Sequence, residues 1–513
     1  MSLTRPDIDI HPKTFPASAL KARTYDVVVI GGGPAGLTTS LRIAQGGFTA
    51  LLIESELVGG ECLYWACVPS KALLRASEAI QNVTSVGGAR EKLELLAKKY
   101  GVPARPEVDL DGLWARRDMF VRRWQDDSLV NEIHGAGVDT AHGFGRLSGV
   151  RKVEIKDWHS GNVEEVEARH AVVIATGSAP LIPQIDGLEN SKYWTAREAV
   201  SAQKVPEHLI ILGAGAVGTE MATLYNQIGS KVTLIAHSIL PKVVPQAGNM
   251  IQESLGKAGV DVILGLELVK VNRTDAMVEA VLSDGSVVKG TEILVATGRK
   301  AQITGMMLEQ FGGPIDGGWA KVDDSMCVSS VPEGWLYAVG DLNGRALMTH
   351  IAKYQAKLAA NSIIAKAKGT YQREVSLNFW NKLTAKPTGL AIAQSIFTDP
   401  QIAACGLTPE QATARGMKIR VVSVSMSDPG SMLHAENYQG WAQWVVDDAG
   451  YLIGATFVGR DAVDLLQAST MAIVGKMTVE QIWHVTPPFP TMSEVYTTLS
   501  EAVEAAVSDV EKL

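Results

Sequence analysis

The sequence predicts an α/β protein with two Rossmann-like (doubly wound) nucleotide-binding domains followed by a C-terminal α+β domain. Two glycine-rich turns of the form G-x-G-x-x-G, at residues 31–36 and 213–218, each follow a short apolar run and predict the nucleotide-binding domains. From about residue 371 the pattern changes to strands and turns and then to helices, which predicts a separate last domain. The 513 residues agree with three domains of roughly 150 residues each.

The first turn belongs to a complete βαβ unit. Residues 26–30 form an apolar run typical of a buried parallel strand, and residues 50–53 form a second strand that ends in Glu54. In such a unit the first glycine permits a tight turn, the second lets the backbone approach a pyrophosphate, and the third lets the helix pack on the strand. The phosphates lie at the helix N-terminus, and the acid accepts hydrogen bonds from ribose hydroxyls. The residues expected to bind this dinucleotide are Gly31, Gly33, Gly36 and Glu54.

The second unit repeats this pattern without the acid. Ala236 occupies the position that Glu54 occupies in the first unit, at the same separation from the first glycine. Alanine has no carboxylate to repel a 2′-phosphate, and the nearby donors His237, Ser238 and Lys242 can bind one, unless they are ordinary surface residues. We therefore predict NADP as the second dinucleotide and keep NAD as an alternative. The residues expected to bind it are Gly213, Gly215, Gly218 and His237.

Two of the four cysteines lie five positions apart, Cys62 and Cys67, just before a helical run. A thiol near a helix N-terminus has a lowered pKa, and Lys71 adds positive charge, so the pair can form a redox-active disulfide. The alternatives are a structural thiol pair or half a zinc site, but no second Cys/His pair has suitable spacing and we expect no metal. Cys327 and Cys405 lack such neighbours and are expected in the core.

Composition excludes several classes of protein. Lys and Arg total 47 against 55 Asp and Glu, which argues against a nucleic-acid binder. No apolar stretch approaches the roughly 18 residues of a membrane span. The first 23 residues lack the apolar core of a signal peptide, so we expect a cytoplasmic protein with a partly mobile N-terminal extension.

In combination, these motifs resemble the class I flavin-dependent pyridine nucleotide–disulfide oxidoreductases, the family of lipoamide dehydrogenase, glutathione reductase and mercuric reductase. The resemblance also rests on the segments ATGR at 296–299, AVGD at 338–341 and FTDP at 397–400. It implies a homodimer. The implied domains are an N-terminal extension at 1–24, a discontinuous FAD-binding domain at 25–182 and 299–370, an NAD(P)-binding domain at 183–298 and a dimer-interface domain at 371–513.

The resemblance also implies a role for each motif residue. The first glycine turn would hold FAD, Asp341 would bind its ribityl chain, and Lys71, paired with Glu220, would lie near flavin N5. Cys67 would be the flavin-proximal thiol and Cys62 the interchange thiol. Further cofactor contacts are implied at Gly145, Thr176, Gly177 and Gly298. The implied enzyme passes electrons from NADPH through FAD to the cysteine pair and on to a small-molecule acceptor.

One motif departs from the family. Its disulfide-reducing members carry His-Pro-Thr-x-x-Glu near the C-terminus, and the histidine serves the partner subunit's thiols as general acid and base. Here Phe489 replaces that histidine, while Glu494 stays in frame as a catalytic candidate without its usual partner. Losing such a group typically costs roughly 10²–10⁴-fold in rate, so we expect an acceptor other than lipoamide or glutathione. The C-terminal cysteine pair of mercuric reductases is also missing.

Three alternatives stay open. The protein can be a quinone or oxygen reductase in which the flavin acts directly, a thiol–flavin carboxylase that dispenses with the histidine, or a non-catalytic flavin-binding redox sensor. A second departure concerns Tyr64 and Trp65, which lie between the cysteines where the family usually has small or polar residues. Their bulk is expected to change the surface beside the disulfide, unless they pack against the FAD domain.

Overall fold

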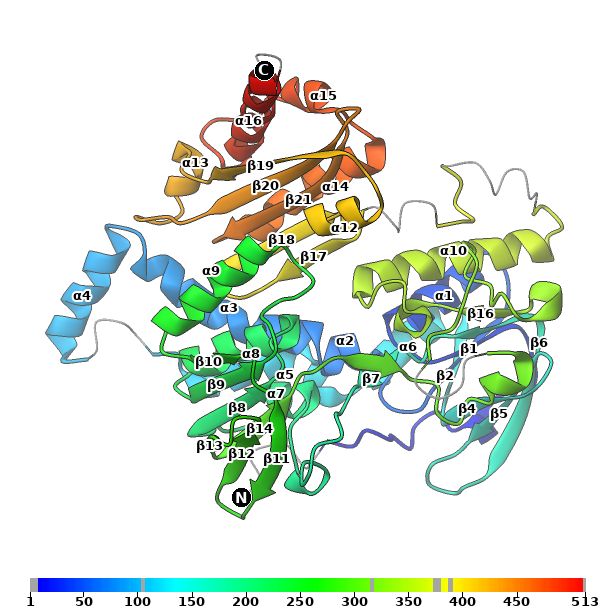
Figure 1. The fold of residues 1–513 in the computed structure, drawn as a ribbon. Helices are drawn as coiled ribbons and strands as arrows, with labels where there is room; N and C mark the ends of the chain where they lie inside the picture. Colours follow the sequence, from blue (N-terminus) through cyan, green and yellow to red (C-terminus); the bar gives the residue numbers. More distant parts are fainter. Residues whose placement is uncertain (1–7, 103–106, 314–317, 372–379, 386–390, 511–513) are drawn as a thin grey trace.

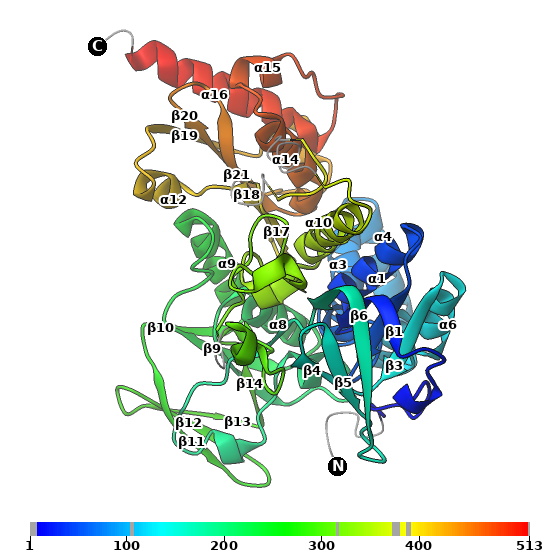
Figure 2. The ribbon, with the colours of Figure 1, turned by 90° about the vertical axis from the view of Figure 1, so that its right-hand side faces the viewer.

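The computed structural model of the chain describes residues 8–102, 107–313, 318–371, 380–385 and 391–510. Figures 1 and 2 show two nucleotide-binding units side by side, with the C-terminal sheet and helices above them. The fold class predicted from the sequence is confirmed. Among the described residues, no helix has the length and apolar character needed to cross a membrane.

The first unit is built on a sheet with the order β3-β2-β1-β6-β5-β4, and β16 pairs with β6. Strands β3, β2, β1, β6 and β16 run parallel, which explains why the central strands are apolar on both faces. Its strands are β1 (Thr24–Ile30), β2 (Ala50–Glu54), β3 (Val138–His142), β4 (Phe144–Gly149), β5 (Lys152–Lys156), β6 (Val163–Ile174) and β16 (Leu336–Ala338). Its helices are α1 (Pro34–Gln45), α2 (Gly60–Tyr64), α3 (Cys67–Thr84), α4 (Ala89–Tyr100), α5 (Leu110–Phe120), α6 (Asp127–Gly135) and α10 (Thr349–Ala367).

The second unit has a parallel sheet of order β10-β9-β8-β14 and a separate antiparallel sheet β11-β12-β13. Strands β7 (Ser178–Pro180) and β15 (Arg299–Ala301) pair where the chain enters and leaves this unit. The parallel strands are β8 (His208–Leu212), β9 (Lys231–Ala236), β10 (Asp261–Leu264) and β14 (Glu292–Val295), and the antiparallel ones are β11 (Leu268–Arg273), β12 (Val278–Leu282) and β13 (Val287–Gly290). The helices are α7 (Ala196–Ser201), α8 (Ala216–Gln227) and α9 (Pro245–Lys257).

The C-terminal unit is an antiparallel sheet of order β17-β18-β21-β20-β19. Its core includes the fully buried Trp444 and Phe457, on which helices α14 and α16 pack. The strands are β17 (Ala393–Ile396), β18 (Gln401–Gly406), β19 (Ile419–Ser425), β20 (Trp441–Asp447) and β21 (Leu452–Gly459). The helices are α12 (Pro409–Ala414), α13 (Pro429–Met432), α14 (Leu466–Gly475), α15 (Val479–Trp483) and α16 (Val495–Val510).

The described part of the N-terminal extension, from residue 8 onward, packs on the first unit. In this N-terminal strap (residues 8–20), Ile8 and Ile10 pack on a cluster of buried residues made by Leu57, Tyr64, Trp65, Val121 and Trp124. Polar contacts hold it as well, because the His11 ring nitrogen lies 2.8 Å from the Ser55 carbonyl oxygen. The apolar side chains of the strap stand among polar residues, so the sequence shows no apolar pattern there. Their burial against the cluster is nevertheless favourable.

Candidate functional site

The first glycine turn forms an open cradle at the N-terminus of α1. A Cβ on Gly31, whose φ is +104°, would lie 2.5 Å from the Ala175 carbonyl oxygen, and a Cβ on Gly36 would lie 1.8 Å from the Gly31 oxygen. A Cβ on Gly33 would meet only the Gly60 Cα, at 3.9 Å. The first and third glycines are therefore required for packing, whereas the middle one leaves backbone accessible where a helix N-terminus attracts phosphate.

Glu54 closes this cradle at the end of β2. Its side chain is buried, and its two oxygens accept hydrogen bonds from the backbone N–H of Gly32 at 2.5 Å and of Glu56 at 2.8 Å. Burial raises the pKa of this carboxyl. The carboxyl is therefore held in one orientation beside the turn, as a group that binds ribose hydroxyls requires.

The second turn repeats the same geometry at the N-terminus of α8. A Cβ on Gly213 would lie 2.5 Å from the Ala296 oxygen, a Cβ on Gly218 would lie 1.8 Å from the Gly213 oxygen, and Gly215 has no atom within 4 Å of such a Cβ. Ala236 ends β9, and His237 after it is exposed. Ser238 and Lys242 are also exposed. These donors are accessible to a ligand bound at the turn.

The two cysteines meet at the junction of α2 and α3. Cys62 lies within α2 and Cys67 is the first residue of α3, where the helix dipole favours a thiolate. The hydrogen bond with Cys62 lowers the pKa of Cys67 to about 6, helped by Thr349 and by the charge of Lys71. The Thr349 hydroxyl lies 3.4 Å from the Cys67 sulfur. The same hydrogen bond, with burial, raises the pKa of Cys62. Cys67 is thus the thiol that ionises first.

This asymmetry predicts the pH dependence of thiol alkylation in the reduced protein. Cys67 should react with iodoacetamide at a rate that falls as the pH drops through about 6, because protonation removes its thiolate. Cys62 should stay slow over the same range because its pKa is raised. Mass spectrometry of peptides quenched at successive times measures both rates. A midpoint near the ordinary thiol value of about 8.5 for Cys67 would contradict the prediction.

Lys71 and Glu220 form an ion pair where the three units meet. Lys71 Nζ lies 2.6 Å from Glu220 Oε2, and the glutamate side chain is only 6% exposed. The other carboxylate oxygen accepts a hydrogen bond from the Phe397 N–H at 3.0 Å, and Lys71 Nζ lies 5.0 Å from the Phe397 ring centroid. Since Lys71 is one helical turn after Cys67, this pair fixes an ammonium group next to the Cys67 thiol.

Asp341 follows β16, at the same carboxyl edge of the first unit's parallel strands as the first glycine turn. Its carboxylate accepts a hydrogen bond of 2.6 Å from the Ser178 hydroxyl, and burial raises its pKa. Arg299 donates to the same hydroxyl at 2.6 Å and to the Ser178 carbonyl oxygen at 2.5 Å. An acid supported in this way can bind hydroxyl groups of a ligand.

The remaining predicted cofactor residues differ in their surroundings. The Thr176 hydroxyl donates to the Gln302 carbonyl oxygen at 2.6 Å. Gly177 and Gly298 have positive φ angles of +75° and +139° and open space around them, apart from one side-chain atom at 3.9 Å from Gly298. Gly145 is explained by packing alone, since a Cβ added there would lie 3.0 Å from Ile53 and 3.1 Å from Ile30.

The departures from the family motifs also have a structural account. Phe489 is 75% exposed in the single chain, and Glu494 accepts a hydrogen bond of 3.0 Å from the Gly430 N–H, so this glutamate has a partner. Tyr64 and Trp65 are buried, at 0% and 6% exposure, and pack beneath the cysteine loop. Of the two possibilities left open by the sequence, the structure shows the second, because both side chains pack into the buried cluster that the strap covers.

The sequence missed several residues around the cysteines. Arg197 of α7 donates to Glu61, the residue before Cys62, at 2.6 Å and to Glu56 at 2.9 Å. Arg299 belongs to the ATGR segment named in the sequence analysis, but its partner Ser178 was not predicted. Nothing in the sequence pointed to Thr349, because its hydroxyl comes close to Cys67 only through the packing of α10. Arg197 likewise comes from a different unit and has no spacing that links it to the cysteines.

Comparisons with known proteins agree with this geometry. The model of the pyridine nucleotide-disulphide oxidoreductase family matches residues 25–358, and that of its dimerisation domain matches residues 392–500. A dihydrolipoyl dehydrogenase from Thermus scotoductus is 30% identical over 94% of this chain and 97% of its own length. A mercuric reductase from Streptomyces lividans is 30% identical over 96% of this chain and 99% of its own.

A solved structure shares the fold. The Cu(II) complex of the HOCl-induced flavoprotein disulfide reductase RclA from Escherichia coli aligns with a TM-score of 0.77 and 21% identity, covering 94% of this chain and 99% of that one. The family matches, together with the fold and the two cradles, make this chain a flavin-dependent oxidoreductase. The chain belongs to the pyridine nucleotide-disulphide oxidoreductase family, and FAD is its flavin.

Proposed function

We propose that this enzyme takes electrons from NADPH, passes them through FAD to the Cys62–Cys67 pair and delivers them to a small acceptor that needs no protein-borne general acid. We further propose that it works as a homodimer. The observation that carries the proposal is the pairing of the cysteines, in which a thiol of lowered pKa lies one helical turn from the Lys71–Glu220 ion pair.

Each part of the site has a task in this scheme. FAD, when bound, supplies hydride acceptance from the nicotinamide and electron transfer to a disulfide. Glu54 and the first glycine turn would hold its ADP half, and Asp341 its ribityl hydroxyls. Lys71 would stabilise negative charge at the flavin edge, and Glu220 would keep that ammonium oriented. Cys67, as thiolate, would face the flavin, while Cys62 would attack the acceptor.

An anaerobic titration of the purified holoenzyme with NADPH tests this electron route. We expect the first equivalent to produce the long-wavelength absorbance of a thiolate lying against oxidised flavin. That absorbance should disappear as the pH falls through about 6, because the Cys67 thiolate is then protonated. If the flavin bleaches in a single step without this absorbance, electrons do not reach the cysteines and the proposal fails.

The preference for NADPH can be tested at the end of β9. Ala236→Glu should shift the ratio of kcat/KM from NADPH toward NADH by roughly tenfold or more, because the new carboxylate repels the 2′-phosphate and accepts ribose hydrogen bonds. Ala236→Gln is the matched control, similar in size without the charge. Steady-state kinetics with both nucleotides measure the effect. An enzyme that already prefers NADH before substitution would contradict the proposal.

The acceptor class follows from Phe489. In a homodimer formed through the dimerisation domain, its exposed ring would face the partner's thiols, where it can exclude water but transfer no proton. Phe489→His should raise lipoamide reduction at least about tenfold, out of the roughly 10²–10⁴-fold that a general acid contributes. Phe489→Leu is the control. Equal lipoamide rates for the wild type and both variants would show that the missing histidine does not limit acceptor choice.

A metal ion is a second candidate acceptor, because its reduction consumes electrons without protons and so suits a site with phenylalanine in place of histidine. Relatives named mercuric reductase, and a structural neighbour solved as a Cu(II) complex, support testing this class. NADPH oxidation stimulated by Hg(II) or Cu(II), and lost in Cys62→Ser, is the expected result. No stimulation by either ion would remove this candidate.

A further inference from the structure

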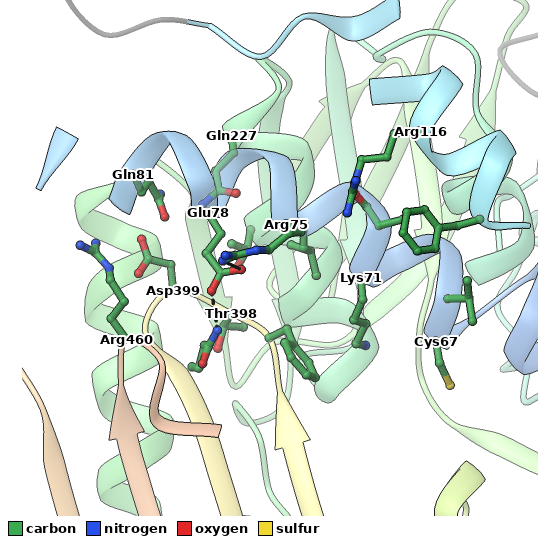
Figure 3. A pocket seen from close by; sticks show the side chains of 17 residues that line it. Cys67, Lys71, Arg75, Glu78, Gln81, Arg116, Gln227, Thr398, Asp399 and Arg460 are labelled. Atoms are coloured by element: carbon green, nitrogen blue, oxygen red, sulfur yellow. Dashed lines mark hydrogen bonds and ion pairs between the residues drawn. The ribbon is translucent and has the colours of Figure 1, made fainter. Parts of the chain in front are cut away.

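A cavity of about 460 Å³ lies along α3 (Figure 3). No glycine of either turn lines it. It extends between α5, α8 and the loop at residues 397–401. Its lining reaches from Cys67 to Gln81, which at 1.5 Å per helical residue corresponds to roughly 20 Å. In Figure 3, Cys67 and Arg460 lie at opposite ends of the lining. An occupant of this space has to be elongated.

When the charges that are already paired are set aside, the cavity lining keeps more positive than negative charge. Arg75 is paired with Glu78 at 2.9 Å, and Lys71 with its glutamate. Arg116 and Arg460 also line the cavity, and neither forms an ion pair with any described residue. Asp399 supplies the single opposing carboxylate outside those pairs. The balance favours an anion.

Arg116 is oriented for such a role. Its Nε donates to the Ala72 carbonyl oxygen at 3.3 Å, and its guanidinium lies 4.7 Å from the Phe120 ring centroid. The hydrogen bond uses only Nε, so the two terminal nitrogens of the guanidinium are left for a ligand. Figure 3 shows the guanidinium directed toward the middle of the lining rather than away from it. A planar fork held in this way suits a carboxylate, sulfonate or phosphate.

Gln401 provides a second and independent indication of a ligand. Its side chain is 7% exposed and lines the cavity, and its Nε2 donates to Glu78 Oε1 at 2.8 Å. The carbonyl oxygen Oε1 has no hydrogen-bond partner among the described residues. A buried acceptor without a donor is destabilising, so a ligand that offers an N–H or O–H group here would be bound favourably.

We propose that this cavity binds an elongated amphipathic organic anion. Its acidic group would pair with Arg116, its N–H or O–H would donate to Gln401 Oε1, and its apolar part would lie against Val68, Leu74 and Phe397. Neither glycine turn lines the site, and its Arg116 and Gln401 contacts do not depend on the electron route proposed above, which places the flavin edge at the Cys67 and Lys71 end. Because Cys67 and Lys71 form one end of the lining, an occupant lies beside the redox thiol.

Isothermal titration calorimetry of the FAD-loaded enzyme with 8-anilinonaphthalene-1-sulfonate tests the proposal. This probe combines two apolar ring systems, a sulfonate and an N–H donor. We expect saturable binding that Arg116→Gln weakens about tenfold, as the loss of one charge-assisted hydrogen bond implies. Arg415→Gln, at an exposed arginine outside the cavity lining, should leave the affinity unchanged.

A second variant, at Gln401, tests the same site without relying on the Arg116 substitution alone. Gln401→Glu places a negative charge where the free acceptor lies and should also weaken the sulfonate probe. Absence of saturable binding, or equal affinities for the wild type, Arg116→Gln and Gln401→Glu, would overturn the proposal. Since the readout is heat of binding, such a failure leaves the electron route untouched, and a failed NADPH titration leaves this site untouched.

Discussion

Cys62→Ser is expected to lower acceptor-dependent NADPH oxidation by roughly 10³-fold or more while the protein keeps its FAD. A serine hydroxyl cannot form a disulfide with Cys67, so electrons that reach the flavin have no route to the acceptor. FAD content should be unchanged, because Cys62 lies in the short helix α2 and supports neither glycine cradle. Steady-state kinetics and the flavin absorbance of the purified variant measure the two quantities.

The matched control for this prediction is Cys327→Ala. Cys327 is a buried thiol next to β16, and it and Cys405 lie in two different core clusters, as expected from the sequence. Its removal should cost stability but spare turnover. Unchanged activity in Cys62→Ser would instead support the quinone or oxygen reductase, in which the flavin acts without thiols.

Gly36→Ala should yield a protein that is colourless or poorly folded. The new Cβ would lie 1.8 Å from the Gly31 carbonyl oxygen, and because both are backbone atoms, no side chain can move to relieve the contact. The turn would have to open, at a cost of at least about 3 kcal/mol to the domain. The ratio of FAD to protein after purification, with thermal unfolding, reports the loss.

Gly256→Ala is the control for the glycine prediction. This residue lies in α9, and a Cβ there would have no atom within 4 Å. Alanine should leave FAD content unchanged and stabilise the helix by up to about 1 kcal/mol. If Gly36→Ala retained a full complement of FAD, the first turn would not be the site of the dinucleotide.

Apart from the Lys71–Glu220 pair, which the family resemblance implied, the parts of the site that the sequence predicted are those set by local spacing. Gly31 and Gly36 are required by contacts within one βαβ unit, and Cys67 begins a helix that its own neighbours specify. Short-range rules of this kind can be read without knowing the fold. Cys62 comes close to Cys67 for the same reason, since only four residues separate them.

The parts that were missed depend on contacts between distant segments. Thr349 reaches Cys67 from α10, and Arg197 reaches the loop before Cys62 from the second unit. Neither belongs to a motif, so only the assembled fold reveals it. The burial of Trp65 was left open for the same reason, because its environment is made by Trp124 and by Ile10 of the strap.

The packing of the N-terminal strap has a consequence for how the protein is made and handled. Ile8 and Ile10 attach to a cluster that includes Trp124, so this contact can form only after the chain as far as Trp124 has been synthesised. A purification tag fused ahead of Ile8 would lie close to the loop that carries Cys62. A tag placed after α16 would be attached to the C-terminal unit instead. Removal of the N-terminal strap should loosen the loop that carries Cys62 before it disturbs either nucleotide-binding sheet.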